Sequence, residues 1–322
     1  MQFKNPDVGI TRWACVLAAC ILVSPAQSIA PRPQDSDQSA GLKLHVETTL
    51  VTIPVAVTDT NNRFVLGLEQ KDFRLFEDGV EQKIAHFSGD DAPLSVGLIF
   101  DISGSMDYKL RTSQAAITQF LKTMNADDEA FLIEFSDAAK VSVAFTRNTS
   151  DIEKALRSVQ PGGLTAMLDA IHLGIHEMKK AKNPRKAILV ISDGGDNHSQ
   201  YKAAQIESLV RDADVQIYAM GVFEPVFSVG LTPEEVSGPK LLSEIATQTG
   251  GRAFAAAFTG DLPSVAARIA LELRNQYVLG YYPKNKNTDG KYRKVEVKLE
   301  QPKGVTPLKA HWRLGYYSAS DN

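Results

Sequence analysis

Asp101, Ser103 and Ser105 bring one carboxylate and two hydroxyls together in a D-x-S-x-S pattern. Gly104 lies between the two serines and eases a tight loop. Ligands that are all oxygen suit a hard cation such as Mg²⁺, which keeps several water molecules and uses one or two carboxylates. The pattern alone is weak, since a chain of this length would contain it by chance roughly 0.1 times. Its position in the chain therefore decides what it means.

Two later loops offer oxygen atoms of the same kind. Thr165 follows Gly162-Gly163-Leu164 just before a predicted helix, and Asp193 follows an apolar stretch at 187–191. Each has a simpler interpretation, Thr165 as a helix cap and Asp193 as a turn residue before two glycines. In an open α/β sheet, however, loops at the carboxyl ends of different strands converge on one ligand site. The order of the three loops favours a single metal site.

The elements that would position these loops alternate between strand and helix over residues 92–276. Leu94 to Phe100 is a near-continuous apolar run, typical of a strand covered on both faces, and an amphipathic helix follows from Leu110 to Met124. Further strands are predicted at 130–135, 140–145, 187–191, 215–222 and 252–256. Further helices are predicted at 150–159, with a capping box from Ser150 to Glu153, and at 166–180, 203–212, 240–249 and 263–275. This succession predicts a doubly wound, mostly parallel α/β sheet, with a hairpin around Asp137.

The flanks on either side, residues 42–91 and 277–322, show only the alternation of strands. The first flank alternates from Leu44 to Val57 and predicts strands at 73–76 and 83–87. The second predicts strands at 277–282, 292–299 and 312–317. A flank of about fifty residues is marginal as an independent sheet. We therefore expect the two flanks to form one small β-sandwich into which the α/β domain is inserted.

The order of these motifs resembles the metal-ion-dependent adhesion site of von Willebrand factor type A (VWA) domains. D-x-S-x-S comes first, Gly-Gly-x-Thr before a helix second, and an apolar strand with Ser-Asp-Gly-Gly third. The resemblance covers about Ala92 to Asn275. The flanks, including Asp72-Phe73 and the stretch 76–79, resemble the secreted bacterial VWA-related group described from acidobacteria.

The resemblance implies a role for each site residue. Ser103 and Ser105 would coordinate the metal directly, and Thr165 would do so in the ligand-bound arrangement. Asp101 and Asp193 would act mostly through bound water. The metal would be Mg²⁺, or Mn²⁺ or Ca²⁺, and an Asp or Glu carboxylate of a partner protein would fill the open position. The identity of that partner does not follow from the resemblance.

The donor set also favours binding over catalysis. Few direct carboxylates leave the ion with residual positive charge, which attracts an anionic oxygen from outside. Such an ion activates water weakly compared with Zn²⁺ held by histidines. Metal-dependent protein binding or adhesion is therefore the expected function, without enzyme activity. A structural scaffold with an unused site and a metal-dependent hydrolase remain the alternatives.

Two enzyme motifs are only partly present in the sequence. His172 and His176 have the spacing of the zinc-protease helix, yet Leu173 stands where that motif needs a glutamate. Ser103 and Ser105 lack the G-x-S-x-G frame of a serine hydrolase. Neither a zinc site nor a serine nucleophile is therefore expected here.

The N-terminus predicts export. Lys4 and Arg12 precede an apolar run at 13–23, and small residues near Ala26 suit cleavage, so residues 1–26 read as a signal peptide and 27–41 as a linker. The run is shorter than the roughly 20 residues of a transmembrane helix. A buried N-terminal helix is the simpler alternative. Leu17 to Cys20 also resembles a lipobox, so membrane attachment is expected only with lipidation at Cys20.

The cysteine content and the net charge argue against several kinds of site and partner. Only two cysteines occur, both inside the predicted signal peptide, so the mature chain would have no disulfide or cysteine metal site. The net charge of −3 gives no reason to expect nucleic acid or anionic lipid.

Overall fold

The computed structural model describes residues 50–222, 233–256, 258–300 and 307–320. The predicted signal peptide, the linker and the first residues of the N-terminal flank lie outside the described residues. Among the helices described, none combines the length and the apolar character that crossing a membrane requires.

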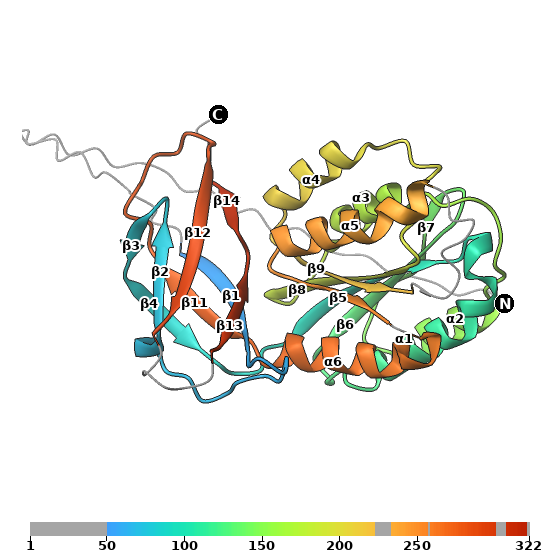
Figure 1. The fold of residues 1–322 in the computed structure, drawn as a ribbon, viewed down its shortest axis with the longest axis horizontal. Helices are drawn as coiled ribbons and strands as arrows, with labels where there is room; N and C mark the ends of the chain where they lie inside the picture. The colour runs from blue at the N-terminus through green and yellow to red at the C-terminus, as the bar shows by residue number, and fades with distance from the viewer. Residues whose placement is uncertain (1–49, 223–232, 257, 301–306, 321–322) are drawn as a thin grey trace, which may run out of the picture. The chain divides into compact units, whose positions relative to one another are not determined.

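A six-stranded sheet forms the α/β domain, in the order β10-β9-β8-β5-β6-β7 (Figure 1). Its strands are β5 (Leu94–Asp101), β6 (Glu129–Phe135), β7 (Ala139–Thr146), β8 (Arg185–Ser192), β9 (Gln216–Gly221) and β10 (Ala253–Ala255). The β6–β7 hairpin is antiparallel, and every other pair is parallel. The predicted doubly wound, mostly parallel sheet is confirmed.

Helices cover both faces of this sheet (Figure 1). One face carries α1 (Leu110–Leu121), α2 (Thr149–Ser158) and α6 (Leu262–Arg274), and the other carries α3 (Met167–Met178), α4 (Ala203–Asp212) and α5 (Pro233–Gln248). Short 3₁₀ turns are η1 (Gln70–Asp72), η2 (Gly104–Lys109) and η4 (Thr259–Asp261). Along β5, Leu98 and Phe100 pack toward α1 and Ile99 toward α3. Burial on both faces explains why this strand is apolar at successive positions.

The flanks form two four-stranded antiparallel sheets, β13-β1-β11-β4 and β14-β12-β2-β3. Their strands are β1 (Val51–Thr58), β2 (Phe73–Glu77), β3 (Val80–Gln82), β4 (Ile84–Ser88), β11 (Tyr277–Tyr281), β12 (Tyr292–Leu299), β13 (Lys309–Trp312) and β14 (Gly315–Tyr317). β1 pairs with β11 and β13, and β2 pairs with β12, so each sheet contains both flanks. Ile53, Leu75, Leu279 and Val297 share one core. The predicted single sandwich built from both flanks is confirmed.

Two predicted elements were wrong in detail. The strand expected at 312–317 is two strands in different sheets, since Trp312 pairs with β1 and Gly315 pairs with β12. The helix expected from Lys240 begins at Pro233 and runs through Pro239. Its buried Leu242 and Ile245 pack against the sheet, and this packing outweighs the local cost of the proline.

The capping box predicted at Ser150 is also absent. α2 begins at Thr149, and the Ser150 hydroxyl donates to the side-chain oxygen of Asn148 instead of capping a backbone amide.

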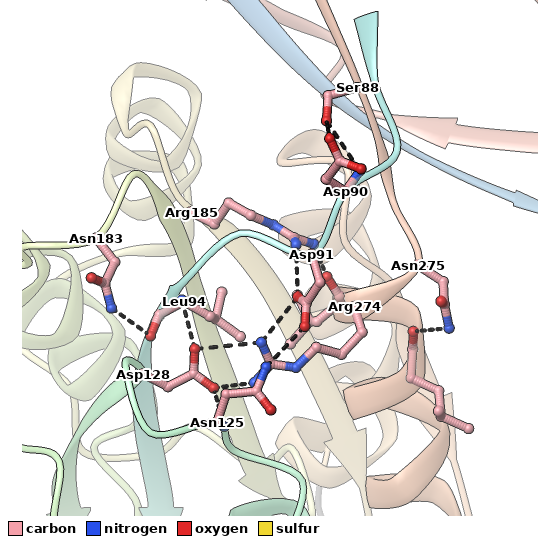
Figure 2. Close-up of polar contacts among 12 residues, drawn as sticks. Ser88, Asp90, Asp91, Leu94, Asn125, Asp128, Asn183, Arg185, Arg274 and Asn275 are labelled. Atoms are coloured by element: carbon pink, nitrogen blue, oxygen red, sulfur yellow. Dashed lines mark hydrogen bonds and ion pairs between the residues drawn. The ribbon is translucent and has the colours of Figure 1, made fainter. Parts of the chain in front are cut away.

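Charged side chains hold the chain where it enters and leaves the α/β domain (Figure 2). Asp91 lies just before β5, and Arg274 is the last residue of α6. The Arg274 guanidinium pairs with the buried carboxylate of Asp128 and lies 3.1 Å from Asp91 Oδ1. Asp128 also accepts a hydrogen bond of 2.8 Å from the Leu94 amide. These contacts bring the two ends of the inserted domain together, as an insertion between neighbouring strands requires.

We expect Arg274→Met to lower the free energy of unfolding by about 3–5 kcal/mol, because the buried Asp128 loses its charged partner. The matched control is Arg157→Met, which removes a guanidinium that is 67% exposed and should cost at most about 1 kcal/mol. Urea denaturation of the full chain measures both. Equal costs for the two variants would show that the Arg274 pair does not stabilise the domain.

Candidate functional site

Three loops meet at the carboxyl ends of β5 and β8. We call them the first loop (101–109), the second loop (159–166) and the third loop (192–199). The first and second are joined by the Gly104 amide, 3.1 Å from the Gly163 carbonyl oxygen, and the Gly162 amide, 2.8 Å from that of Ile102. The structure therefore brings together the loops that carry all five predicted site residues.

Asp101 ends β5 and is fully buried. Its Oδ1 accepts a 2.9 Å hydrogen bond from the Ser103 amide, and its Oδ2 accepts a 2.6 Å hydrogen bond from the Ser192 hydroxyl. Burial, followed by the nearby negative charge of Asp193, raises the pKa of Asp101 to about 7. The negative charge of Asp193 disfavours ionisation of Asp101, and a cation bound near both carboxylates would reverse that effect.

Ser103 and Ser105 present their hydroxyls side by side. Their Oγ atoms are 3.2 Å apart, with Ser103 buried and Ser105 half-buried. Ser103 precedes η2, and its carbonyl accepts the Met106 amide at 3.1 Å, which makes the turn tight. Neighbouring oxygen ligands around an octahedral Mg²⁺ lie about 3 Å apart, because each is about 2.1 Å from the ion. The serine pair therefore has the spacing that such an ion needs.

Thr165 is tied to the third loop through its backbone. Its amide donates to Asn197 Oδ1 at 2.8 Å, and its carbonyl accepts from the amides of Asn197 and His198. The residue is 4% exposed. α3 begins at Met167 with Ala166 as its N-cap, so Thr165 is not the helix cap that the simpler interpretation required.

Asp193 follows β8 and is also buried. Its Oδ2 accepts a 3.0 Å hydrogen bond from the ammonium of Lys109, whereas Oδ1 has no hydrogen-bond partner within the described part of the chain. Leaving a buried acceptor unpaired costs about 1–3 kcal/mol, and more for a charged group. A bound cation, or water held by one, would satisfy this atom, so the donor set fits a hard divalent ion.

Sequence reasoning missed two residues of the site. Ser192 donates to Asp101 and accepts the Gly194 amide at 2.9 Å, so it bridges the first and third loops. Its place directly before Asp193 at a strand end is a signal that could have identified it. Lys109 is buried against Asp193, and no local pattern marked it, because its partner lies on another loop.

The histidines of α3 take part in packing. The His172 ring stacks on Tyr201 with a centroid distance of 4.0 Å, and on His176 at 6.0 Å. Burial lowers the pKa of His172, which favours its neutral form. The ring thus helps to hold the segment after the third loop against α3.

A family model described as the von Willebrand factor type A domain matches residues 96–195. That span runs from within β5 to just past Asp193, and it therefore contains all five predicted site residues. The matched span contains the helices α1, α2 and α3 and the strands β6, β7 and β8. The chain contains a VWA domain. The family predicted from the motifs is thereby confirmed.

Several known proteins resemble parts of this chain. An uncharacterized protein of Synechocystis, sll0103, is 29% identical over 134 residues, which is 40% of this chain and 32% of that protein. Inter-alpha-trypsin inhibitor heavy chain H3 of Bos taurus is 28% identical over 134 residues, 38% of this chain and 15% of that one. The chain thus spans about a third of the first relative and less of the second.

Among solved structures, the von Willebrand factor type A protein of Catenulispora acidiphila matches with a TM-score of 0.49 and 12% identity. The match covers 85% of this chain and 74% of that one.

We expect Ser192→Ala to lower the free energy of unfolding by about 1–3 kcal/mol, because the buried Asp101 carboxylate loses a hydrogen-bond donor. Ser158→Ala is the matched control, since that hydroxyl is exposed and bonds only within the last turn of α2. Chemical denaturation compares them. An unchanged stability for Ser192→Ala would mean that this hydrogen bond does not hold the VWA site together.

Proposed function

We propose that this protein is exported and binds a partner protein through a divalent cation held by the VWA loops. The observation that carries the proposal is the buried Asp193 Oδ1, which has no hydrogen-bond partner in the described structure. It accompanies two serine hydroxyls placed 3.2 Å apart. An unsatisfied carboxylate oxygen and paired hydroxyls on adjoining loops are the kinds of donor that a hard cation takes, Mg²⁺ or alternatively Mn²⁺ or Ca²⁺.

Each residue would have a separate task. Ser103 and Ser105 would coordinate the ion directly, and Thr165 would join them when a partner is bound. Asp101 and Asp193 would hold the water molecules around it. The ion would supply one open position for an Asp or Glu carboxylate from the partner.

The hydrogen bonds of the site support binding over catalysis. Both oxygens of Asp101 already accept hydrogen bonds, and one oxygen of Asp193 is paired with Lys109. With both of its oxygens occupied, Asp101 is poorly placed to take a proton from water or a substrate. The Ser103 hydroxyl bonds to Ser105, not to a histidine base. We therefore propose that the protein is not an enzyme.

Two exposed apolar residues lie on the loops that supply the hydroxyls. Tyr108 on the first loop is 64% exposed, and Leu164 on the second is 47% exposed. Aromatic side chains are enriched among residues that anchor protein interfaces. A protein partner could cover both residues while its carboxylate reaches the ion.

Export rests on the N-terminal sequence, where a basic start precedes a short apolar run. Signal-peptide cleavage near Ala26 would release a chain without cysteine. Lipidation at Cys20 is the alternative and would attach the protein to a membrane.

We expect millimolar Mg²⁺ or Mn²⁺ to raise the Tm of the full chain by several degrees, because a ligand at 100 times its Kd stabilises the folded state by about 2.7 kcal/mol. Asp101→Asn should abolish the shift, since it removes a charge without changing the shape of the side chain. Asp107→Asn, on the same loop but exposed, should retain the shift. Differential scanning calorimetry with metal and with EDTA measures all three.

An unchanged wild-type Tm would leave the VWA domain as a structural scaffold with an unused site. Turnover of an ester or phosphate substrate that Asp101→Asn abolishes would instead establish a hydrolase.

For the partner, we expect a protein crosslinked from the native envelope to bind in Mg²⁺ and to dissociate in EDTA. Tyr108→Ala should weaken this binding by about tenfold or more while keeping most of the metal-induced Tm shift, because the proposed role of the ring is to contact the partner and not the ion. Biolayer interferometry with the identified partner measures the loss. Binding that persists in EDTA would contradict a metal-mediated contact.

A further inference from the structure

Lys109 places a positive charge inside the proposed metal site. Its Nζ lies 3.0 Å from Asp193 Oδ2, and the two side chains are only 9% and 6% exposed. Lys109 therefore forms a buried ion pair with Asp193, and its positive charge is largely held out of water.

The Lys109 ammonium supplies positive charge next to the buried carboxylates of the site. Asp101 and Asp193 put two carboxylates into a space that water hardly reaches. Lys109 pairs with one of them, so its charge offsets part of this buried negative charge without a metal ion. The pairing is built into the fold, because Lys109 ends η2, the same turn that holds Ser105.

A divalent ion would have to share Asp193 with this lysine. The ion would face Oδ1 while the ammonium occupies Oδ2 of the same carboxylate. Two cations on one buried carboxylate repel strongly, since the local dielectric is low. A nearby alternative position exists for the ammonium, because its Nζ is already 5.1 Å from the ring centroid of the exposed Tyr108.

We propose that Lys109 is an internal competitor of the metal ion at Asp193, and that it sets the metal affinity of the VWA site. The inference rests on the proposed function, because it requires that the site binds a divalent ion. Loading the site moves the ammonium away from Asp193 toward solvent and Tyr108. The loaded site then keeps an extra positive charge close to the open position, which favours an anionic partner group.

Isothermal titration calorimetry with Mg²⁺ and with Mn²⁺ alone tests this in the full chain. Lys109→Met should lower the Kd for the metal by about tenfold or more, because the repelling charge is gone. In EDTA the same variant should have a lower Tm than the wild type, since Asp193 loses its partner, and Mg²⁺ should close that gap. Lys109→Arg keeps the charge and should bind metal as the wild type does.

A second measurement uses the unaltered protein, so it decides the matter even if Lys109→Met fails to fold. Trace acylation of lysines, read by mass spectrometry, should show Lys109 protected in EDTA and more reactive in Mg²⁺. Lys182, exposed at the opposite end of β8, is not part of the site and should react equally in both.

The outcomes separate the two proposals. If the wild type binds no metal, the proposed function and the role of Lys109 both fail. If the wild type binds metal but Lys109→Met binds it equally or more weakly, only the competition is overturned, and Lys109 instead positions Asp193. Unchanged acylation of Lys109 on metal binding would likewise overturn the competition.

Discussion

Asp101 carries a carboxylate at the end of β5, where water does not reach it, and the surrounding loops are arranged to satisfy it. The Ser103 amide and the Ser192 hydroxyl each donate to one of its oxygens. The first hydrogen bond shapes the turn that presents Ser103 and Ser105. The second fixes the start of the third loop and with it Asp193. Burying one charge thus determines the geometry of two loops.

The same principle operates at the opposite end of the sheet. Asp128 is buried and paired with Arg274, which joins the end of α6 to the segment before β6 (Figure 2). Insertion of a domain between neighbouring strands requires its two ends to lie close together, and Arg274 also pairs with Asp91, which lies just before β5 at the other end. The two flanks can then pair strand with strand, so that β1 lies between β11 and β13. The strands β1 and β4 of the first flank pair only with strands of the second flank in the sheets described.

The VWA fold accounts for where the site lies but not for what it binds. Loops at the carboxyl ends of parallel strands are the usual ligand position of an open α/β sheet. A fold shared by many proteins does not carry one function with it, and the Synechocystis and Bos taurus relatives align over a minority of this chain and of their own length. The chemistry depends instead on the side chains at Asp193, where Lys109 pairs with one oxygen and the other has no partner among the described residues.

Local pattern was enough to predict most of the architecture and the position of the site. β5 is buried on both faces and is therefore apolar at successive positions, whereas α1 is buried on one face and is therefore amphipathic. Both patterns can be read from neighbouring residues in the sequence. The order of the three motifs along the chain predicted that Asp101, Thr165 and Asp193 would lie on adjoining loops. Their binding of metal stays a prediction.

Tertiary structure alone decided the contacts between residues distant in sequence. Lys109 meets Asp193 across 84 positions, and Ser192 meets Asp101 across 91. It also decided that the segment at 312–317 divides between two sheets, and that α5 continues through Pro239. In each case the deciding energy comes from burial against another part of the chain, which the pattern of neighbouring residues does not contain.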